Sequence, residues 1–267
     1  MANIALQSAS TALSALNTRL DVTANNLANI NTAGFKASRV NFQDLLYIER
    51  AQPGVENANG DQRPTGLYVG LGVKVSGTQV SFVQGSPIQT DEELDVMIEG
   101  SGFFQVAIPE APGGVAYTRA GNFTLNSDGE LVLATDQGRR LEPNITIPAD
   151  AEKIEIDATG RIFVRIQGQA EPQEIAQLET AVFVNPAGLS QVGENLFVES
   201  AASGPPITGQ PGTETRGTIR QGYLEASNVD PTKELIELIR TQRAFEFNSQ
   251  TIRTADETLR SVAQLRR

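Results

Sequence analysis

The sequence predicts an α+β protein: long N- and C-terminal helices form an α-helical coiled coil, and the chain between them forms a mainly antiparallel β domain. Three observations carry this prediction. They are a leucine heptad near the N-terminus, an apolar heptad near the C-terminus, and short β-branched or aromatic runs between them. With 267 residues, 39% of them hydrophobic, the chain is long enough to bury a sizeable core.

The N-terminal segment repeats apolar residues at heptad spacing, with a second set three positions after the first. The two sets are Leu6, Leu13, Leu20 and Leu27, and Ala9, Leu16, Thr23 and Ile30. Because no glycine or proline interrupts the pattern before Gly34, we expect a single helix that ends with Gly34 as its C-cap. Its apolar stripe is narrow, so the helix needs a partner.

The C-terminal segment has a similar pattern. Asp230 followed by Pro231 predicts an N-cap with proline in the first turn. The heptad residues are Leu238, Phe245, Ile252 and Leu259, supported by Leu235, Ile239, Val262 and Leu265. Polar residues fill the second heptad position, so this helix also needs a partner.

Between the helices, apolar runs alternate with glycine, asparagine and proline turns, which is typical of antiparallel strands. The segments LNSDGEL (125–131) and IDATGRI (156–162) predict hairpins. We expect three parts: a helical core of residues 1–34 and 230–267, a connecting segment of 35–66 and 200–229 with an extended loop, and an outer β domain of 67–199.

Composition excludes several classes of function. The chain has no histidine and no cysteine, which removes the usual general base, the commonest metal ligand, disulfides and thiolate zinc sites. Of the net charge of −11, the segment between Asp44 and Asp230 carries −13, which argues against nucleic acid and anionic membranes as partners. We find no signal-peptide pattern and no apolar run of membrane-spanning length, so we expect export by a route without a cleaved signal.

The candidate active sites are weak, and we expect no catalytic, cofactor-binding or metal-ligating residues. GLGVKV (70–75) lacks the third glycine of a nucleotide fingerprint and leads into strand. The carboxylates of DEELD (91–95) alternate poorly for one face of a strand, so a solvated turn is favoured over a metal site. NSDGE (126–130) lacks the spacing and terminal glutamate of an EF-hand loop and indicates a plain turn. Paired carboxylates leave a glycan hydrolase open, but a chain without tryptophan offers few sugar platforms.

The arrangement of the two ends suggests assembly. Two helices with one stripe each bury both stripes by packing on each other and on copies from neighbouring chains. The asparagines at 25, 26, 29 and 31 weaken an isolated helix, so we expect Asn25, Asn26, Asn29 and Asn31 to find hydrogen-bond partners on neighbouring subunits. An intramolecular coiled-coil stalk that carries a β head is the alternative from patterning alone.

Two long segments resemble a known family. NNLANINTAGFKASRVNFQDLLY (25–47) and QGYLEASNVDPTKELIELIRTQRAFEFNSQTIRTADETL (221–259) are similar to the N- and C-terminal signatures of bacterial flagellar axial proteins, the rod and hook subunits. GSGFFQV (100–106) and YTRAGNFTLNSDGELV (117–132) extend the resemblance over nearly the whole chain.

Within that family, the length and LLYIERAQPG (45–54) are most similar to distal rod subunits. The resemblance implies a non-enzymatic subunit of a rigid helical tube that transmits torque from motor to hook and encloses the export channel. It implies heptad packing of Leu6, Leu13, Leu16, Leu20, Leu27 and Ile30 with Leu238, Phe245, Ile252 and Leu259. It also implies a rod-stiffening loop that includes Tyr47, Gln52, Pro53, Gly54 and Pro64.

The partners that the resemblance implies are further copies of the chain, adjacent proximal rod and hook subunits, surrounding ring proteins, and the type III export apparatus. It implies a place in the basal body, in the rod that crosses the periplasm, without a cofactor, nucleic acid or membrane insertion. The alternatives are another rod or hook subunit of the family, a secreted glycan hydrolase, and a stalked adhesin.

Overall fold

The computed structural model describes residues 2–55, 62–109, 112–166 and 171–265. They form two compact units: unit 1 comprises 1–27, 38–79 and 230–267, and unit 2 comprises 28–37 and 80–229. Residues 38–79 thus group with the terminal helices, and residues 200–229 group with the central strands. The three-part division expected from the sequence stays a prediction.

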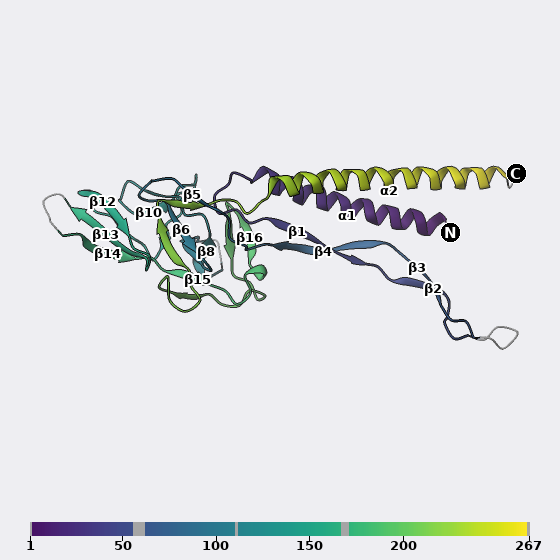
Figure 1. The fold of residues 1–267 in the computed structure, drawn as a ribbon, viewed down its shortest axis with the longest axis horizontal. Coiled ribbons are helices and arrows are strands. Elements are labelled where there is room, and N and C mark those ends of the chain that lie inside the picture. Colours follow the sequence, from purple (N-terminus) through teal and green to yellow (C-terminus); the bar gives the residue numbers. More distant parts are fainter. Residues whose placement is uncertain (1, 56–61, 110–111, 167–170, 266–267) are drawn as a thin grey trace. The chain divides into compact units, whose positions relative to one another are not determined.

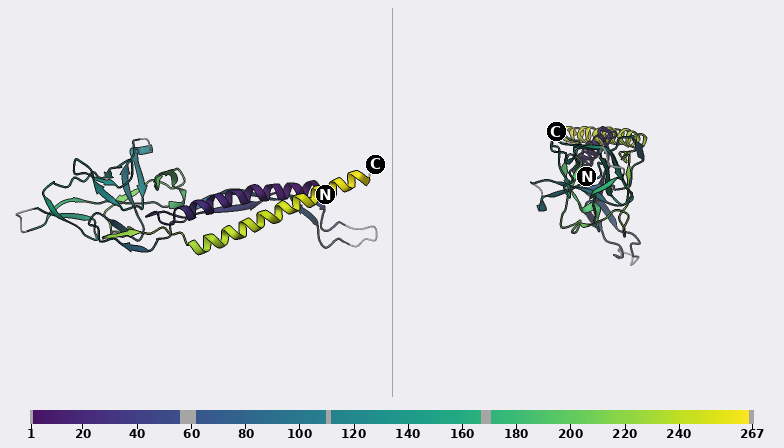
Figure 2. Two further views of the ribbon diagram at one scale, coloured as in Figure 1. Left: turned by 90° about the horizontal axis from the view of Figure 1, so that it is seen from above. Right: turned by 90° about the vertical axis from the view of Figure 1, so that its left-hand side faces the viewer.

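Two long helices dominate unit 1, and they pack together. Helix α1 spans Ala2–Ala28 and helix α2 spans Pro231–Leu265, and Figures 1 and 2 show them running alongside each other. With the antiparallel sheets of unit 2, these helices confirm the predicted α+β class. No helix among the described residues is long and apolar enough to cross a membrane.

The end of α1 differs from the prediction. The helix ends at Ala28, so Ile30 lies in the turn that follows, and Gly34 is not the C-cap. The turn is held by backbone bonds from Thr32 N–H to Asn29 O (3.2 Å) and from Phe35 N–H to Thr32 O (3.2 Å). The Thr32 hydroxyl also donates to Asn29 Oδ1, a local bond of the kind that competes with continued helix.

The start of α2 confirms the predicted cap. Asp230 Oδ1 accepts the backbone N–H groups of Thr232 (3.0 Å) and Lys233 (3.2 Å), while Pro231 is the first helical residue. These bonds satisfy N–H groups that have no partner within a helix.

The rest of unit 1 is a β ribbon that bears a second two-stranded sheet, here called the arm. The ribbon pairs β1 (Ser38–Asp44) with β4 (Val73–Val80), and the arm pairs β2 (Tyr47–Ala51) with β3 (Leu67–Gly70) in antiparallel register. The ribbon contacts α1 near Gly72, where an added Cβ would lie 2.2 Å from Thr11 Oγ1.

Unit 2 is built from antiparallel sheets. The largest has the order β16 (Ser190–Gly193), β17 (Leu196–Val198), β8 (Val115–Thr118), β7 (Phe103–Ala107), β15 (Thr180–Val182) and β18 (Ile207–Gly209), with β11 (Leu141–Glu142) also on β7. The smaller sheets are β12 (Ala151–Ile156) with β13 (Arg161–Ile166) and β14 (Gln173–Gln177), β9 (Phe123–Leu125) with β10 (Leu131–Leu133), β6 (Val96–Glu99) with β19 (Thr218–Gln221), and β5 (Pro87–Gln89) with β20 (Tyr223–Glu225). Two short 3-10 helices lie at Pro112–Gly114 and Pro186–Gly188.

Both predicted hairpins of unit 2 are confirmed. Leu125 pairs with Leu131 across β9 and β10, and Ile156 pairs with Ile162 across β12 and β13. Between these sheets lie a large aliphatic core, which includes Phe104, and a second core of aromatic rings. In the second core Phe103 meets Phe183 edge to face at 5.9 Å between ring centroids.

Candidate assembly interface

Polar side-chain contacts join the two helices. Arg19 forms an ion pair with Glu237, and Asn26 Nδ2 donates to Glu234 Oε1 at 3.2 Å. Partial burial raises the pKa of Glu234 above its ordinary value, although the bond from Asn26 acts in the opposite direction. On its other side α1 contacts the ribbon, where the Arg19 guanidinium lies 5.8 Å from the centre of the Phe42 ring.

Most of the predicted heptad residues are only half-buried in the single chain. This holds for Leu6, Leu13, Leu16, Leu20, Leu27, Ile30, Leu238, Phe245 and Ile252, whereas Leu259 is exposed. The fully buried positions on α1 are smaller or polar, namely Ala9, Ala15, Thr23 and Asn26. Each helix therefore keeps apolar surface that its own chain does not cover.

The structure gives Asn26 a role inside the chain, which differs from the predicted contact with a neighbouring subunit. Only 2% of Asn26 is exposed. Its Nδ2 donates to Ser38 O at 2.8 Å and its Oδ1 accepts the Ser38 N–H at 2.9 Å, so the side chain holds the first residue of β1. Asn25 and Asn31 are exposed, and Asn29 is half-buried, so these three amides stay predictions.

A second face of α2 also carries exposed apolar side chains. Leu235 and Ile239, assigned to support the heptad, are about half-exposed, as is Ile236, and 68% of Phe247 is exposed. Ile236 and Phe247 lie eleven positions apart, which is about three helical turns, so they share one face. The heptad pattern does not include Ile236 and Phe247, so this second apolar face of α2 becomes visible in the sequence only when residues on every face of the helix are compared.

Threonines continue the Phe247 face towards the C-terminus. A shallow depression there is lined by Phe247, Gln250, Thr251, Thr254, Ala255 and Thr258. The hydroxyls of Thr251, Thr254 and Thr258 donate to backbone carbonyls one turn earlier at 2.8 to 3.0 Å. Because these hydroxyls already have partners, another helix can cover the face without stripping water from an unpaired donor.

The arm also exposes large apolar side chains. Leu46 is 83% exposed, and Tyr47, Ile48, Leu67 and Tyr68 are exposed as well. Tyr47 lies in β2, while Gln52, Pro53, Gly54 and Pro64 lie in the turn beyond it, closed by a bond from Gly54 N–H to Arg63 O at 2.8 Å. Residues 56–61 of the predicted stiffening loop lie outside the described residues. A two-stranded sheet with this much apolar surface gains stability when a partner covers it.

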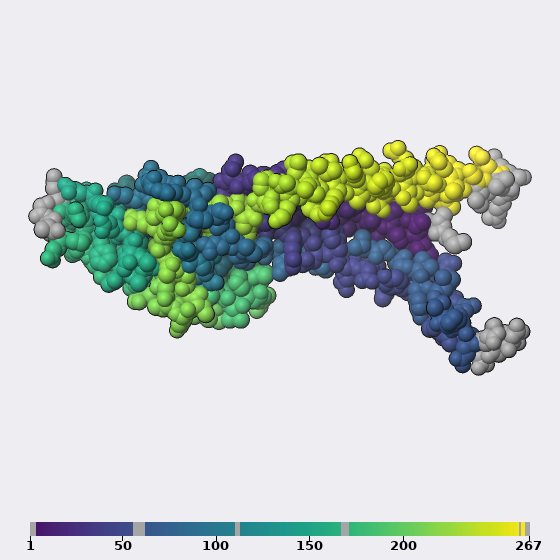
Figure 3. Space-filling view, viewed as in Figure 1, coloured from purple at the N-terminus to yellow at the C-terminus, as the bar shows by residue number. Residues whose placement is uncertain are grey.

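Figure 3 shows these unit 1 segments as surfaces, with α2 in yellow-green and the arm in blue. Helix α2 and the arm share one property, which is apolar surface that the rest of the chain leaves partly uncovered. Such patches mark sites of protein contact.

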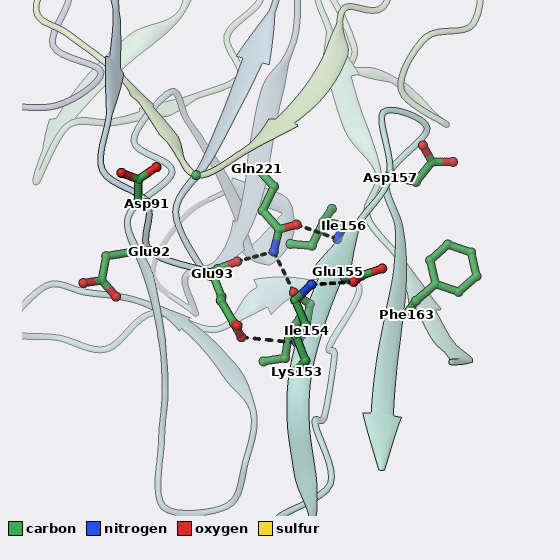
Figure 4. A pocket seen from close by; sticks show the side chains of 11 residues that line it. Asp91, Glu92, Glu93, Lys153, Ile154, Glu155, Ile156, Asp157, Phe163 and Gln221 are labelled. Carbon is green, nitrogen blue, oxygen red and sulfur yellow. Dashed lines mark hydrogen bonds and ion pairs between the residues drawn. The ribbon is translucent and has the colours of Figure 1, made fainter. Parts of the chain in front are cut away.

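A carboxylate-lined depression lies in unit 2, next to DEELD. Figure 4 shows the Gln221 amide at its centre, with Asp91 and Glu92 on one side and Asp157 on the other. Gln221 Nε2 donates to the carbonyl oxygens of Glu93 (2.7 Å) and Ile154 (2.8 Å), so it holds strands together. Within the described residues, no group of three or more acidic side chains could hold a metal ion.

Two carboxylates of this depression lie in surroundings that keep them ionised. A hydrogen bond and ion pair from Lys153 lower the pKa of Glu155, and the backbone N–H of Ala158 lowers the pKa of Asp157. A glycan hydrolase needs one carboxylic acid that stays protonated near neutral pH, which requires a raised pKa. These two groups are shifted in the opposite direction.

Three family models match successive parts of the chain. Residues 6–36 match "Flagella basal body rod protein", residues 97–164 match "Flagellar hook protein FlgE/F/G D1 domain", and residues 220–265 match "Flagellar basal body rod FlgEFG protein C-terminal". The first match includes residues 25–36 of the N-terminal signature, and the third contains the whole C-terminal signature, 221–259.

Curated relatives agree over nearly the full length. The chain is 46% identical to the flagellar basal-body rod protein FlgG of Agrobacterium fabrum over 261 residues, 97% of this chain and 98% of that protein. It is 44% identical to FlgG of Caulobacter vibrioides over 264 residues, 98% and 99% of the two chains. Identity to FlgF of the same organism is 33% over 258 residues, 93% and 92% of the two chains.

Proposed function

This chain belongs to the family of the flagellar basal-body rod protein FlgG and is a distal rod subunit, and we propose how its surfaces build the rod. The family is structural and non-enzymatic. In the proposal, the terminal helices of many copies pack into a rigid helical tube that encloses the export channel and transmits torque from motor to hook. The observation that carries this proposal is the uncovered apolar surface of both helices, at the two ends of one chain.

The helices supply the polymer core. The half-buried heptad residues of α1, including Leu13 and Leu20, pack further against Phe245 and Ile252 of the same or a neighbouring subunit. The Phe247 face of α2 packs against the next copy. Each contact is small, but all must shear together when a tube bends, so the tube is stiff.

The arm bridges neighbouring subunits through its exposed apolar side chains. In this account Tyr47 and Tyr68 lie against a second copy, while the turn with Pro53 and Gly54 sets the reach of the arm. Bridging of this kind restricts sliding between subunits and keeps the rod straight.

Membership of the family implies assembly into the rod polymer, and the more specific partners are part of the proposal. They are the proximal rod and hook subunits at the two ends of the distal rod and the ring proteins around it. We propose the type III export apparatus as the route by which the subunits of this rod, which crosses the periplasm, are exported.

Excision of the arm tests the stiffening role. Leu45 N–H donates to Gly72 O at 2.9 Å, so residues 46–71 can be removed with the two ends already adjacent. We expect the excised subunit to form tubes that bend more than wild-type tubes in electron micrographs. Tyr47→Ser with Tyr68→Ser, which keeps the arm length, should give an intermediate effect. Unchanged straightness of the excised tubes would refute the role of the arm.

A further inference from the structure

The motif GFK (34–36) and the segment LEASN (224–228) lie side by side in unit 2. Gly34 N–H donates to Glu225 O at 2.7 Å, and Asn228 N–H donates to Phe35 O at 3.3 Å. Ala37 N–H donates to Asn228 Oδ1 at 2.7 Å. We call residues 28–37 the first connector and residues 222–229 the second connector, because α1 leads into the first and the second leads into α2.

A buried charge cluster joins the two connectors to the β strands. Lys36 Nζ lies 2.5 Å from Glu225 Oε1, and Arg119 Nη1 lies 3.6 Å from Glu225 Oε2. Side-chain exposure is 0% for Lys36, 1% for Glu225 and 5% for Arg119. One carboxylate on the second connector therefore faces two cations, one on the first connector and one in the β body.

Every member of the cluster is held by further bonds. Lys36 Nζ also donates to Val83 O at 2.9 Å, and the Arg119 guanidinium donates to the carbonyls of Ile98 (3.3 Å) and Gly100 (2.6 Å). Glu225 Oε1 accepts Gly85 N–H at 2.8 Å, whereas Oε2 has no hydrogen-bond partner among the described residues. The nearest cation to Oε2 in this cluster is the Arg119 guanidinium.

The backbone packs closely around the cluster at two glycines. At Gly34, where φ is +69°, an added Cβ would lie 2.5 Å from Ala120 N. At Gly85 an added Cβ would lie 1.9 Å from Ala226 O. The first connector therefore lies directly against the backbone at Ala120, and the second lies directly against the backbone at Gly85.

These charges make the two connectors depend on each other. If the second connector lifted away, Lys36 and Arg119 would stay buried without a counter-charge. If the first connector lifted away, Glu225 would lose its closest cation and Lys36 would lose its carboxylate. Burial lowers the pKa of both cations below their ordinary values, as expected where unpaired charge is disfavoured.

We propose that Lys36, Glu225 and Arg119 form a latch that makes the two connectors dock on the β body together or not at all. The latch fixes in one step where the chain leaves α1 and where it enters α2. It acts within a single subunit and does not depend on the proposed polymer contacts.

Amide hydrogen exchange of the full chain as a monomer tests the latch reciprocally. Glu225→Gln keeps the side-chain shape but leaves two buried cations, so exchange of the Gly34 and Ala37 amides should rise by about a hundredfold or more. Lys36→Met leaves Glu225 paired with Arg119 and should give a smaller rise. That rise should still reach the Ala226 amide of the second connector, which donates to Ser86 O at 2.9 Å.

The matched control is Glu155→Gln, since Glu155 pairs with Lys153 at 2.7 Å on the surface of unit 2 and should leave both connectors unchanged. The effect of Glu225→Gln should also be smaller in the Lys36→Met background, where only one buried cation remains. The latch is refuted if each substitution speeds exchange only in its own connector, or if the two effects simply add. If Glu225→Gln unfolds unit 2 as a whole, the Lys36→Met comparison still decides.

Discussion

At the scale of single residues, the structure reinterprets the cluster of asparagines at the end of α1. Asn26 binds both backbone groups of Ser38, so it connects the helix to the start of the ribbon. A leucine at 26 would leave both of those groups without their partner, at a cost of about 1–3 kcal/mol. We therefore predict that Asn26→Leu speeds hydrogen exchange at the Ser38 amide in the free subunit.

Asn17→Leu is the control, because Asn17 is exposed on the same helix and its replacement should change stability by less than about 0.5 kcal/mol. If Asn26→Leu left Ser38 protected and impaired only polymerisation, the original prediction of an inter-subunit amide would be the better account.

Asp230 gives a prediction about pH. Hydrogen bonding from the Lys233 backbone N–H, with help from the Lys233 ammonium, holds the pKa of Asp230 below its ordinary value. Because the folded pKa is depressed, the stabilisation is fully present above about pH 4, the ordinary aspartate range, and is lost as pH falls through the folded pKa. Asp230→Asn keeps an acceptor without the charge, so its α2 helix should lack this acid-sensitive step in circular dichroism. Identical acid profiles for both proteins would contradict this assignment.

At the scale of elements, the heptads predicted both helices but not how each one is covered. The heptad spacing identifies an apolar stripe on each segment, and both segments form the predicted helices, α1 and α2. Spacing does not say how much of that stripe the same chain covers, and Leu259 is exposed. The arm was harder to foresee, because the polar turn of residues 51–66 hid the short apolar strands on either side.

The two faces of α2 should respond differently to substitution. Phe247→Ser removes a side chain that is exposed in the monomer, so it should leave monomer stability within about 0.5 kcal/mol and still reduce polymer yield. Phe245→Ser removes a half-buried ring and should lower both. Thermal unfolding and sedimentation of assembled material measure the two effects. Normal polymer yield from Phe247→Ser would remove this face from the interface.

At the scale of the whole molecule, the sequence predicted the class of protein better than the contacts between distant segments of the chain. The absence of histidine and cysteine and the helical ends pointed away from enzymes and towards assembly. The latch of Lys36, Glu225 and Arg119 was invisible, because its members lie far apart in the chain and single charged residues carry no periodic signal. Local sequence patterns predict helices and strands, whereas contacts between distant segments become visible only in the folded structure.

The central claim is that the terminal helices form the core of the rod and that the Phe247 face and the arm contact neighbouring copies. Electron cryomicroscopy of the assembled tube tests it most directly. We predict that α1 and α2 line the central channel, with Phe247 buried against an adjacent subunit and Tyr47 and Tyr68 of the arm lying on another. A tube whose subunits touch only through unit 2, with both helices facing solvent, would contradict the account.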